Sequence, residues 1–253
     1  MSDMELKNRW LAEEAVAHMK GWDFSHIEDR YTEENHLPWD YRGMVLAHLK
    51  PDMQLLDMGT GGGEFLLTLG HPYDHTTVTE GYPPNAQLCR ETLVPLGIRV
   101  VESDGGQPLP LPDAAFDLVI NRHESYDPRE VYRILKPGGM FITQQVGEFN
   151  DRELVELLLP GLPLPFPGHS AAPQAQRFRE AGFTILQEAE HFGDIRFYDV
   201  GALVWFARIL PWEFEGFSVE RCLPRLMDAQ RLLDEQGVIS GRTHRFLIVA
   251  QKA

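Results

Sequence analysis

The feature that most constrains this chain is a glycine-rich segment that directly follows a short apolar run. Residues 53–57 read Met-Gln-Leu-Leu-Asp, and residues 57–63 follow the pattern Asp-x-Gly-x-Gly-x-Gly. Glycine allows positive φ and lets the backbone approach a ligand without a Cβ atom. Residues 64–67 can open a helix. We therefore expect a strand, a tight loop and a helix N-terminus, the arrangement that forms the ligand crevice of an open α/β sheet.

The glycine spacing separates this loop from two common nucleotide-binding loops. Dinucleotide-binding proteins use G-x-G-x-x-G, and the phosphate-binding P-loop ends in Lys followed by Ser or Thr. Residues 57–63 match neither pattern. The acidic Asp57 at the strand end suits a cationic or ammonium-bearing ligand better than a pyrophosphate.

Four further segments continue a strand-and-turn pattern. Residues 75–80 are rich in β-branched side chains, which favour a strand, and they end in Glu80, 23 residues after Asp57. A carboxylate at such a position can accept hydrogen bonds from ribose hydroxyls. Further strands are predicted at 98–103, before Asp104-Gly105, at 116–121, and within 133–143, where a Lys-Pro-Gly-Gly turn precedes the strand.

These segments resemble the class I S-adenosylmethionine-dependent methyltransferases over residues 51–146. The loop at 57–63 is similar to the family's motif I, and residues 98–143 are similar to its Asp-(Gly/Ala), Phe-Asp-Leu-Val and Arg-x-Leu-Lys-Pro-Gly-Gly series. The resemblance implies S-adenosyl-L-methionine as the cofactor, with Glu80 on the ribose and Asp104 on the adenine amino group. The residues that it implies for cofactor binding are Asp57, Gly59, Thr60, Gly61, Gly63, Glu80, Gly81, Asp104, Gly105, Asn121 and Arg122.

The resemblance also implies the fold. We expect a doubly wound α/β domain at 49–253, with a seven-stranded, mainly parallel sheet. The sixth strand is predicted at 183–191, and the last strand, 245–251, should run antiparallel between the fifth and the sixth. A helical segment at 1–48 precedes this domain and is interpreted as a lid.

An insertion at about 192–243 separates the sixth and seventh predicted strands. Connections of that length are rare in compact domains unless they are functional, so we interpret it as part of the acceptor pocket. A helix should begin after Ser218, a good N-cap. The aromatic content of the insertion suits an apolar ligand pocket, with ordinary core packing as the alternative; these residues are Phe197, Tyr198, Trp205, Phe206, Trp212, Phe214 and Phe217.

The expected chemistry leaves few sequence signatures. An activated methyl donor carries the difficult chemistry itself, so the protein mainly aligns the reactants and excludes water. A general base is needed only if the acceptor must lose a proton. His123, in the Asn-Arg-His-Glu segment at 121–124, is the candidate because histidine has an unperturbed pKa of ~6.5; a structural hydrogen bond is its alternative role. Some members of the family that this chain resembles carry an Asn/Asp-Pro-Pro-Tyr motif here for methylation of base or glutamine nitrogens. This chain has none, which argues against that group of substrates.

The composition of the chain limits the chemical class of the methyl acceptor. There are 38 acidic residues against 23 Lys and Arg, a formal net charge of −15, and no basic cluster. Nucleic-acid binding usually requires a basic surface, so a small-molecule acceptor is favoured.

The two cysteines, Cys89 and Cys222, lack metal-ligand spacing, and no metal is expected. No signal peptide and no apolar run of 18 residues are seen, so we expect a cytoplasmic protein without a membrane span. The alternatives are a cofactor-binding protein without transferase activity, and a methyltransferase that acts on RNA or protein. The sequence does not predict the oligomeric state.

Overall fold

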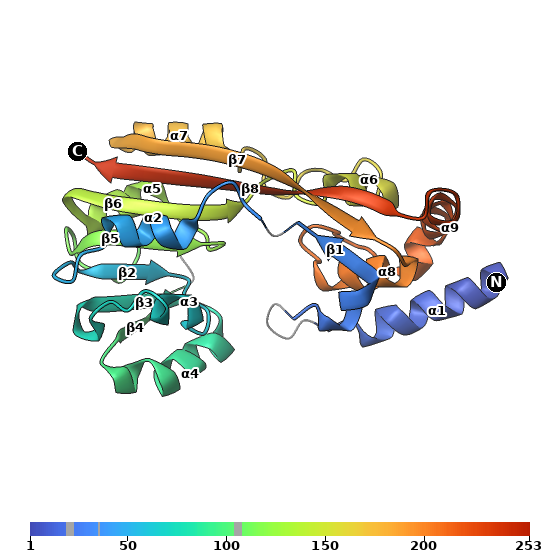
Figure 1. Cartoon of the computed structure of the whole chain (residues 1–253), viewed down its shortest axis with the longest axis horizontal. Helices are drawn as coiled ribbons and strands as arrows, with labels where there is room; N and C mark the ends of the chain where they lie inside the picture. Colours follow the sequence, from blue (N-terminus) through green and yellow to red (C-terminus); the bar gives the residue numbers. More distant parts are fainter. Residues whose placement is uncertain (19–22, 35, 104–107) are drawn as a thin grey trace. The chain divides into compact units, whose positions relative to one another are not determined.

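The structure is a computed structural model that describes residues 1–18, 23–34, 36–103 and 108–253, and it forms two compact units (Figure 1). Unit 1 comprises Met1–Leu37, Glu148–Pro167 and Phe192–His244, and unit 2 comprises Pro38–Gly147, Gly168–His191 and Arg245–Ala253. The helices are α1 (Asp3–Val16), α2 (Tyr41–His48), α3 (Glu64–Leu67), α4 (Pro83–Thr92), α5 (Pro128–Ile134), α6 (Arg152–Leu158), α7 (Ala171–Glu180), α8 (Val200–Ile209) and α9 (Val219–Gln236), with short 3-10 turns η1 (Ser25–Arg30), η2 (Tyr73–His75) and η3 (Val94–Leu96).

The strands form one eight-stranded sheet in the order β1-β7-β8-β6-β5-β2-β3-β4. They are β1 (Tyr31–Glu33), β2 (Leu55–Met58), β3 (Thr76–Glu80), β4 (Arg99–Glu102), β5 (Phe116–Arg122), β6 (Leu135–Val146), β7 (Phe183–Phe197) and β8 (Ile239–Lys252). Strands β2 to β6 pair in parallel, whereas β8 runs antiparallel to β6. The predicted mainly parallel sheet is therefore confirmed, including an antiparallel last strand between the fifth and sixth predicted strands.

Helices cover both faces of the sheet in unit 2 because its strands are apolar on both sides. Successive side chains of a strand point to opposite faces, so Leu56 and Val119 pack under α5 and α7, whereas Leu55 and Leu118 pack under α2, α3 and α4. Strands buried on both faces appear in sequence as continuous apolar runs. This explains why the runs before Asp57 and Asn121 were recognisable as strands.

The structure contains one strand that the sequence did not predict, and two predicted strands are longer than expected. The eighth strand, β1, comes from the N-terminal segment expected to be helical, and its three residues are too few for a periodic pattern. Strand β7 continues past residue 191 to Phe197, through Gly193, where a Cβ atom would lie 2.9 Å from the Thr243 hydroxyl oxygen. Strand β8 begins at Ile239, before the predicted start at 245. Glycine therefore marks close packing inside a strand here, although it usually signals a turn in sequence.

Most of the aromatic residues of the 192–243 insertion pack the core of unit 1. Phe197, Trp205, Phe206, Phe214 and Phe217 are at most 4% exposed and belong to one apolar cluster with α1, α6, α8 and α9. Tyr198 and Trp212 are the exposed members of the set. Core packing therefore accounts for five of these seven side chains. The predicted helix after Ser218 is confirmed as α9, with the Ser218 hydroxyl accepting from the Arg221 N–H.

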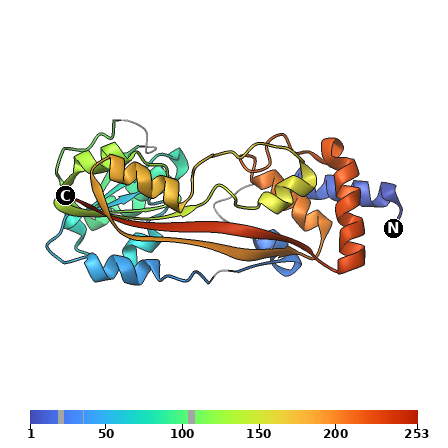
Figure 2. The same ribbon diagram turned by 90° about the horizontal axis from the view of Figure 1, so that it is seen from above.

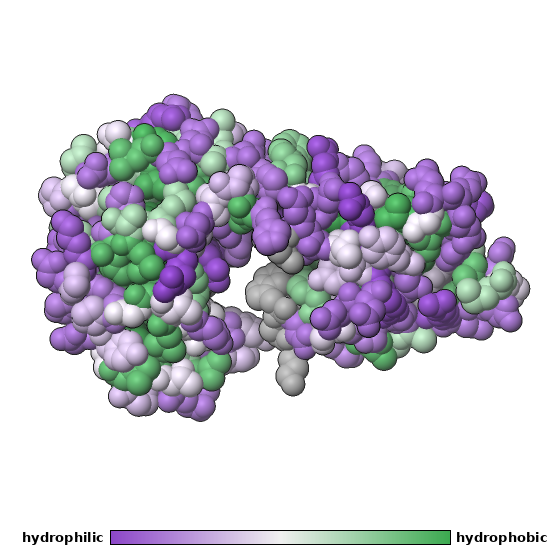
Figure 3. All heavy atoms as spheres, viewed as in Figure 1, coloured by the Kyte–Doolittle hydropathy of each residue, from purple (hydrophilic) through white to green (hydrophobic). Residues whose placement is uncertain are grey.

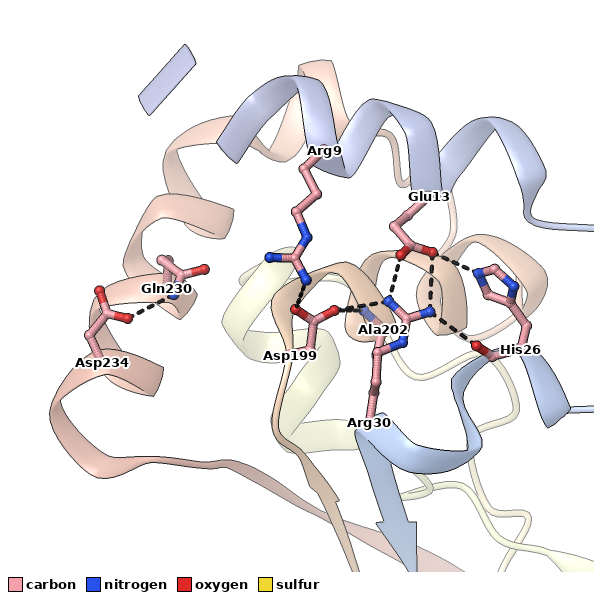
Figure 4. Close-up of polar contacts among 8 residues, drawn as sticks. All are labelled: Arg9, Glu13, His26, Arg30, Asp199, Ala202, Gln230 and Asp234. Atoms are coloured by element: carbon pink, nitrogen blue, oxygen red, sulfur yellow. Dashed lines mark hydrogen bonds and ion pairs between the residues drawn. The ribbon is translucent and has the colours of Figure 1, made fainter. Parts of the chain in front are cut away.

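A charge network joins three elements of unit 1 (Figure 4). Arg30 lies between two carboxylates: it donates to Glu13 of α1 and, at 3.1 Å, to Asp199, which caps α8 through the Ala202 N–H. Arg9 also binds Asp199, and His26 binds Glu13. The side chains of Arg30, Glu13 and Asp199 are 25%, 15% and 18% exposed, so solvent screens these contacts only in part.

We expect Arg30→Met to destabilise unit 1 because it leaves Glu13 and Asp199 partly buried with fewer partners. The expected loss lies between that of an exposed and a buried ion pair, about 1–3 kcal/mol in the free energy of unfolding measured with urea. Arg231→Met is the matched control, since that side chain is 69% exposed, and it should change stability by less than ~0.5 kcal/mol. Equal losses in the two variants would contradict this role of Arg30.

Candidate functional site

The glycine loop is fixed to the end of the neighbouring strand. After β2 the chain turns through Gly59, Gly61 and Gly63, with φ of +68°, +64° and +85°, before α3 begins. The N–H groups of Gly59 and Thr60 both donate to the Thr79 carbonyl of β3 at 3.0 Å. Because these φ values favour glycine, the pattern read from the sequence is the pattern that this turn requires.

Glu80 connects the loop to the end of β3. Its side chain is 4% exposed, and its two carboxylate oxygens accept from the Gly61 N–H at 2.7 Å and the Tyr82 N–H at 2.8 Å. A Cβ atom added to Gly61 would meet no atom of the described residues within 4 Å. The backbone conformation favours glycine at this position, but packing against the described residues does not, so the space beside the loop and Glu80 is open to a ligand.

Asp57 is a buried carboxyl group beneath the same loop. It is 6% exposed and accepts a 2.7 Å hydrogen bond from the Thr60 hydroxyl. Burial raises the pKa of Asp57 to about 7, although the Thr60 hydrogen bond and the charge of Arg122 act in the opposite direction. A cationic group placed beside Asp57 would favour its ionised form.

Asn121 offers a buried hydrogen-bond donor at the same edge of the sheet. Its side-chain oxygen accepts from the Thr143 hydroxyl at 2.8 Å and the Gln145 amide at 2.5 Å. Its Nδ2 atom has no hydrogen-bond partner among the residues that the structure describes. Tyr41 of α2 braces this strand end, because its hydroxyl lies 3.0 Å from the Asn121 carbonyl oxygen and 3.2 Å from that of Ile142. A buried donor of this kind is available to a ligand.

The turn after β5 carries charged groups that affect His123. This residue has φ of +60°, and its N–H donates to the Gln144 carbonyl at 3.0 Å. His123 is an exposed residue; desolvation of its ring by the surrounding chain and the positive charges of Arg245 and Arg122 nevertheless lower its pKa. His123 is therefore neutral at pH 7, and it is a weaker proton acceptor than an ordinary histidine.

Glu124, the last residue of the 121–124 segment, received no role of its own from the sequence, and it lies directly over the loop. A Cβ atom on Gly59 would be 2.5 Å from Glu124 Cγ and 2.9 Å from its Oε2. The other carboxylate oxygen, Oε1, accepts from the Ser125 N–H at 2.8 Å and the Ser125 hydroxyl at 2.9 Å. Glu124 is a loop residue outside any motif, so only the fold reveals its contact with Gly59.

The remaining predicted site residues have the following positions. Gly63 precedes α3 in a left-handed conformation, Gly81 directly follows β3, and Arg122 ends β5 with its guanidinium 4.3 Å from the centre of the Phe65 ring. Asp104 and Gly105 lie outside the described residues. The described candidates lie in and beside the loop, at the end of β3 and at the end of β5. The structure thus brings them together at one edge of the sheet, as expected for parallel strands.

Comparison with known proteins agrees with this site. Residues 56–143, which contain the whole glycine loop, Glu80 and the 121–124 turn, match the family model of a methyltransferase domain. The chain is 31% identical over 137 residues to a demethylmenaquinone methyltransferase of Thermus thermophilus. That match covers 47% of this chain and 62% of the relative, so the chain spans less than two thirds of the relative's length.

Solved structures agree on the fold. A protein of Bacillus halodurans C-125 provisionally named a methyltransferase has a TM-score of 0.54 at 18% identity, over 84% of this chain and 98% of that one. A functionally unknown protein of Deinococcus radiodurans R1 has a TM-score of 0.56 at 15% identity, over 88% and 91%. The family match at residues 56–143, the relative and the shared fold together support a class I, Rossmann-like methyltransferase domain, as the sequence resemblance indicated. Among the described helices, none has the length and apolar character needed to cross a membrane.

Proposed function

We propose that unit 2 binds S-adenosyl-L-methionine and that the protein transfers the methyl group to a small-molecule acceptor. The observation that carries this proposal is the contact of Glu80 with the Gly61 N–H at 2.7 Å, beside a glycine with open space around it. A carboxylate at this point can also accept hydrogen bonds from a ribose, since each carboxylate oxygen has two acceptor sites.

The described residues fit such a cofactor. In this proposal Gly59 and Gly61 lie under the methionine part, and Asp57 provides negative charge for its ammonium group. The unpartnered amide of Asn121 supplies a donor at the end of β5. Asp104 and Gly105 would hold the adenine, but they lie outside the described residues.

The residues of this chain would mainly position the methyl donor and the acceptor, and would take little part in covalent chemistry. The bound cofactor supplies a methyl group that is already activated on a sulfonium. Fixing the loop through Thr79 and Glu80 orients the donor, and orientation can lower a barrier by ~7–11 kcal/mol. His123 is proposed as the base for an acceptor that must lose a proton; its lowered pKa makes it a weak one.

The choice of a small acceptor has two supports. The formal net charge is −15, which disfavours a nucleic-acid substrate. Hydrophilic side chains cover much of the face in Figure 3, without distinction of charge sign. The relative from Thermus thermophilus is named for a small molecule, demethylmenaquinone. A cytoplasmic location belongs to the same proposal. The role of residues 1–48 and 192–243 at the acceptor stays a prediction.

Two measurements separate the alternatives. Calorimetric titration with S-adenosylhomocysteine should show saturable binding to one site, whereas a scaffold without cofactor binding would show none. A metabolite screen with S-adenosylmethionine labelled on the methyl group should then place label in a small molecule. Label retained on protein or RNA would favour a macromolecular acceptor, and binding without any transfer would favour a non-catalytic protein.

Asp57 should make cofactor binding depend on pH. With a pKa of about 7, this carboxyl group is largely protonated in the ligand-free protein at pH 5.5, and only its ionised form attracts an ammonium group. We expect affinity for S-adenosylhomocysteine to rise at least ~3-fold from pH 5.5 to 7. Calorimetry in buffers of different ionisation enthalpy should show proton release on binding. Asp57→Asn should remove most of that release; if it does not, the proton comes from another group.

The same carboxyl group sets the sign of a stability effect without ligand. Asp57 binds its proton more tightly in the folded protein, with a pKa of about 7 against an ordinary 3.8. Between these values the folded state holds more protons, so the free energy of unfolding falls as pH rises. The melting temperature should therefore decrease from pH 5 to 7 more steeply in the wild-type protein than in Asp57→Asn. Parallel pH profiles would contradict the raised pKa.

A further inference from the structure

Unit 1 contains a concavity that the proposed function does not use. It has a volume of about 330 Å³ and lies between the loop that follows α6 and the first turns of α9. These two helices lie side by side (Figure 2). Its lining residues, which are 158–163, Arg221, Cys222 and Arg225, all belong to unit 1, whereas the candidate cofactor residues belong to unit 2. Ligand pockets typically span ~300–1,000 Å³, so this one suits a small molecule.

The wall formed by the loop is apolar and restrained. Leu158 and Leu159 are 1% and 6% exposed and anchor the loop in the core of unit 1, and Leu162 packs against that core. Pro160 and Pro163 have fixed φ angles, which limits the freedom of the backbone between them. The apolar surface that a ligand can reach, formed by Pro160, Leu162 and Pro163, therefore exists before any ligand binds.

The wall formed by α9 carries two positive charges. Arg221 and Arg225 are four residues apart and share one side of the helix. The Arg221 guanidinium donates to the Gly216 carbonyl at 2.9 Å, and no carboxylate of the described residues pairs with it. Arg225 contacts Asp228 at 3.5 Å, but Asp228 also pairs more closely with Arg231. In a chain with a net charge of −15, two arginines with so little carboxylate pairing beside an apolar wall require an explanation.

We propose that this concavity binds a small anionic amphiphile, with its carboxylate or phosphate on Arg221 and Arg225 and its apolar chain against Leu162 and the two prolines of the loop. Guanidinium groups bind both anions through paired hydrogen bonds, and the apolar surface of the loop favours an apolar body. Cys222 lies between the arginines and is only 2% exposed. Burial raises the pKa of its thiol, so the thiol stays protonated and does not act as a nucleophile at neutral pH.

Calorimetric titration of the full chain with octanoate tests this proposal, in the absence of any methyl donor. Octanoate should bind saturably, and octanol, which lacks the charge, and acetate, which lacks the chain, should each bind at least ~10-fold more weakly, a difference of about 1.4 kcal/mol. Octyl phosphate distinguishes the source of the anion: tighter binding than octanoate assigns the site to a phosphate, and weaker binding assigns it to a carboxylate.

Two variants of unit 1 localise the binding. Arg221→Gln with Arg225→Gln should weaken octanoate at least ~10-fold, while Arg196→Gln, an exposed arginine of β7 outside the lining, should leave it within twofold. Circular dichroism melting verifies that each variant is folded, and the single Arg225→Gln variant replaces the double one if the latter is not. Absence of octanoate binding, equal binding of octanol, or full binding by the folded arginine variants would each overturn the proposal.

Discussion

Gly59→Ala should abolish measurable binding of S-adenosylhomocysteine and lower the free energy of unfolding by about 2–4 kcal/mol. An L-residue at φ of +68° is strained, and the new methyl group would lie 2.5 Å from Glu124 Cγ. Glu124 cannot withdraw freely because Ser125 holds its carboxylate. The loop must therefore shift, and its hydrogen bonds to Thr79 shift with it. Urea unfolding and calorimetric titration measure the two effects.

Gly61→Ala is the matched control for this change. Its φ of +64° gives a similar strain, but the added methyl would meet no atom of the described part of the chain within 4 Å. We expect a smaller loss of stability, about 1–2 kcal/mol. Binding should still weaken, because the methyl would occupy the space beside Glu80 that we assign to the cofactor. If both variants lose the same stability, the contact of Glu124 with Gly59 does not add to the strain of the Gly59→Ala variant.

Glu80→Ala should weaken S-adenosylhomocysteine binding at least tenfold while the fold stays intact. The change removes the proposed acceptor of the ribose hydroxyls, and hydrogen bonds to charged groups contribute ~1.5–3 kcal/mol each, where about 1.4 kcal/mol is tenfold in affinity. It also leaves the Gly61 and Tyr82 N–H groups without this partner. Calorimetric titration measures the affinity, and thermal unfolding verifies the fold.

Two further variants refine this prediction. Glu80→Gln keeps one oxygen acceptor, so its affinity should lie between those of the wild-type protein and Glu80→Ala. Glu91→Ala removes an exposed carboxylate from α4 and should bind like the wild-type protein. Unchanged affinity in Glu80→Ala would place the ribose elsewhere.

The parallel core and the loop were predictable because their physical requirements are local. The apolar runs at Leu55-Leu56 and Leu118-Ile120 must be buried on both faces of the sheet, and the glycines of the loop adopt positive φ. Both requirements constrain residue types over a few positions, so a single sequence reveals them.

What the sequence did not reveal depends on distant contacts. Strand β1 forms only because β7 offers Phe197 and Ile195 as partners for Tyr31 and Glu33. The same holds for Glu124, whose position over Gly59 follows from the turn after β5. From the sequence, the aromatic residues of the insertion fit a ligand pocket and a packed core equally well, because an apolar side chain suits either environment.

The most direct test of the central claim is a titration of ¹⁵N-labelled protein with S-adenosylhomocysteine, followed by the backbone amide resonances. We predict saturable shifts at Gly59 to Gly63 and at Glu80 to Tyr82, with one ligand bound per chain, because these amides surround the proposed cofactor position. A ligand that binds while these resonances stay unchanged, or that does not bind at all, would contradict the assignment of unit 2 as the methyl-donor site.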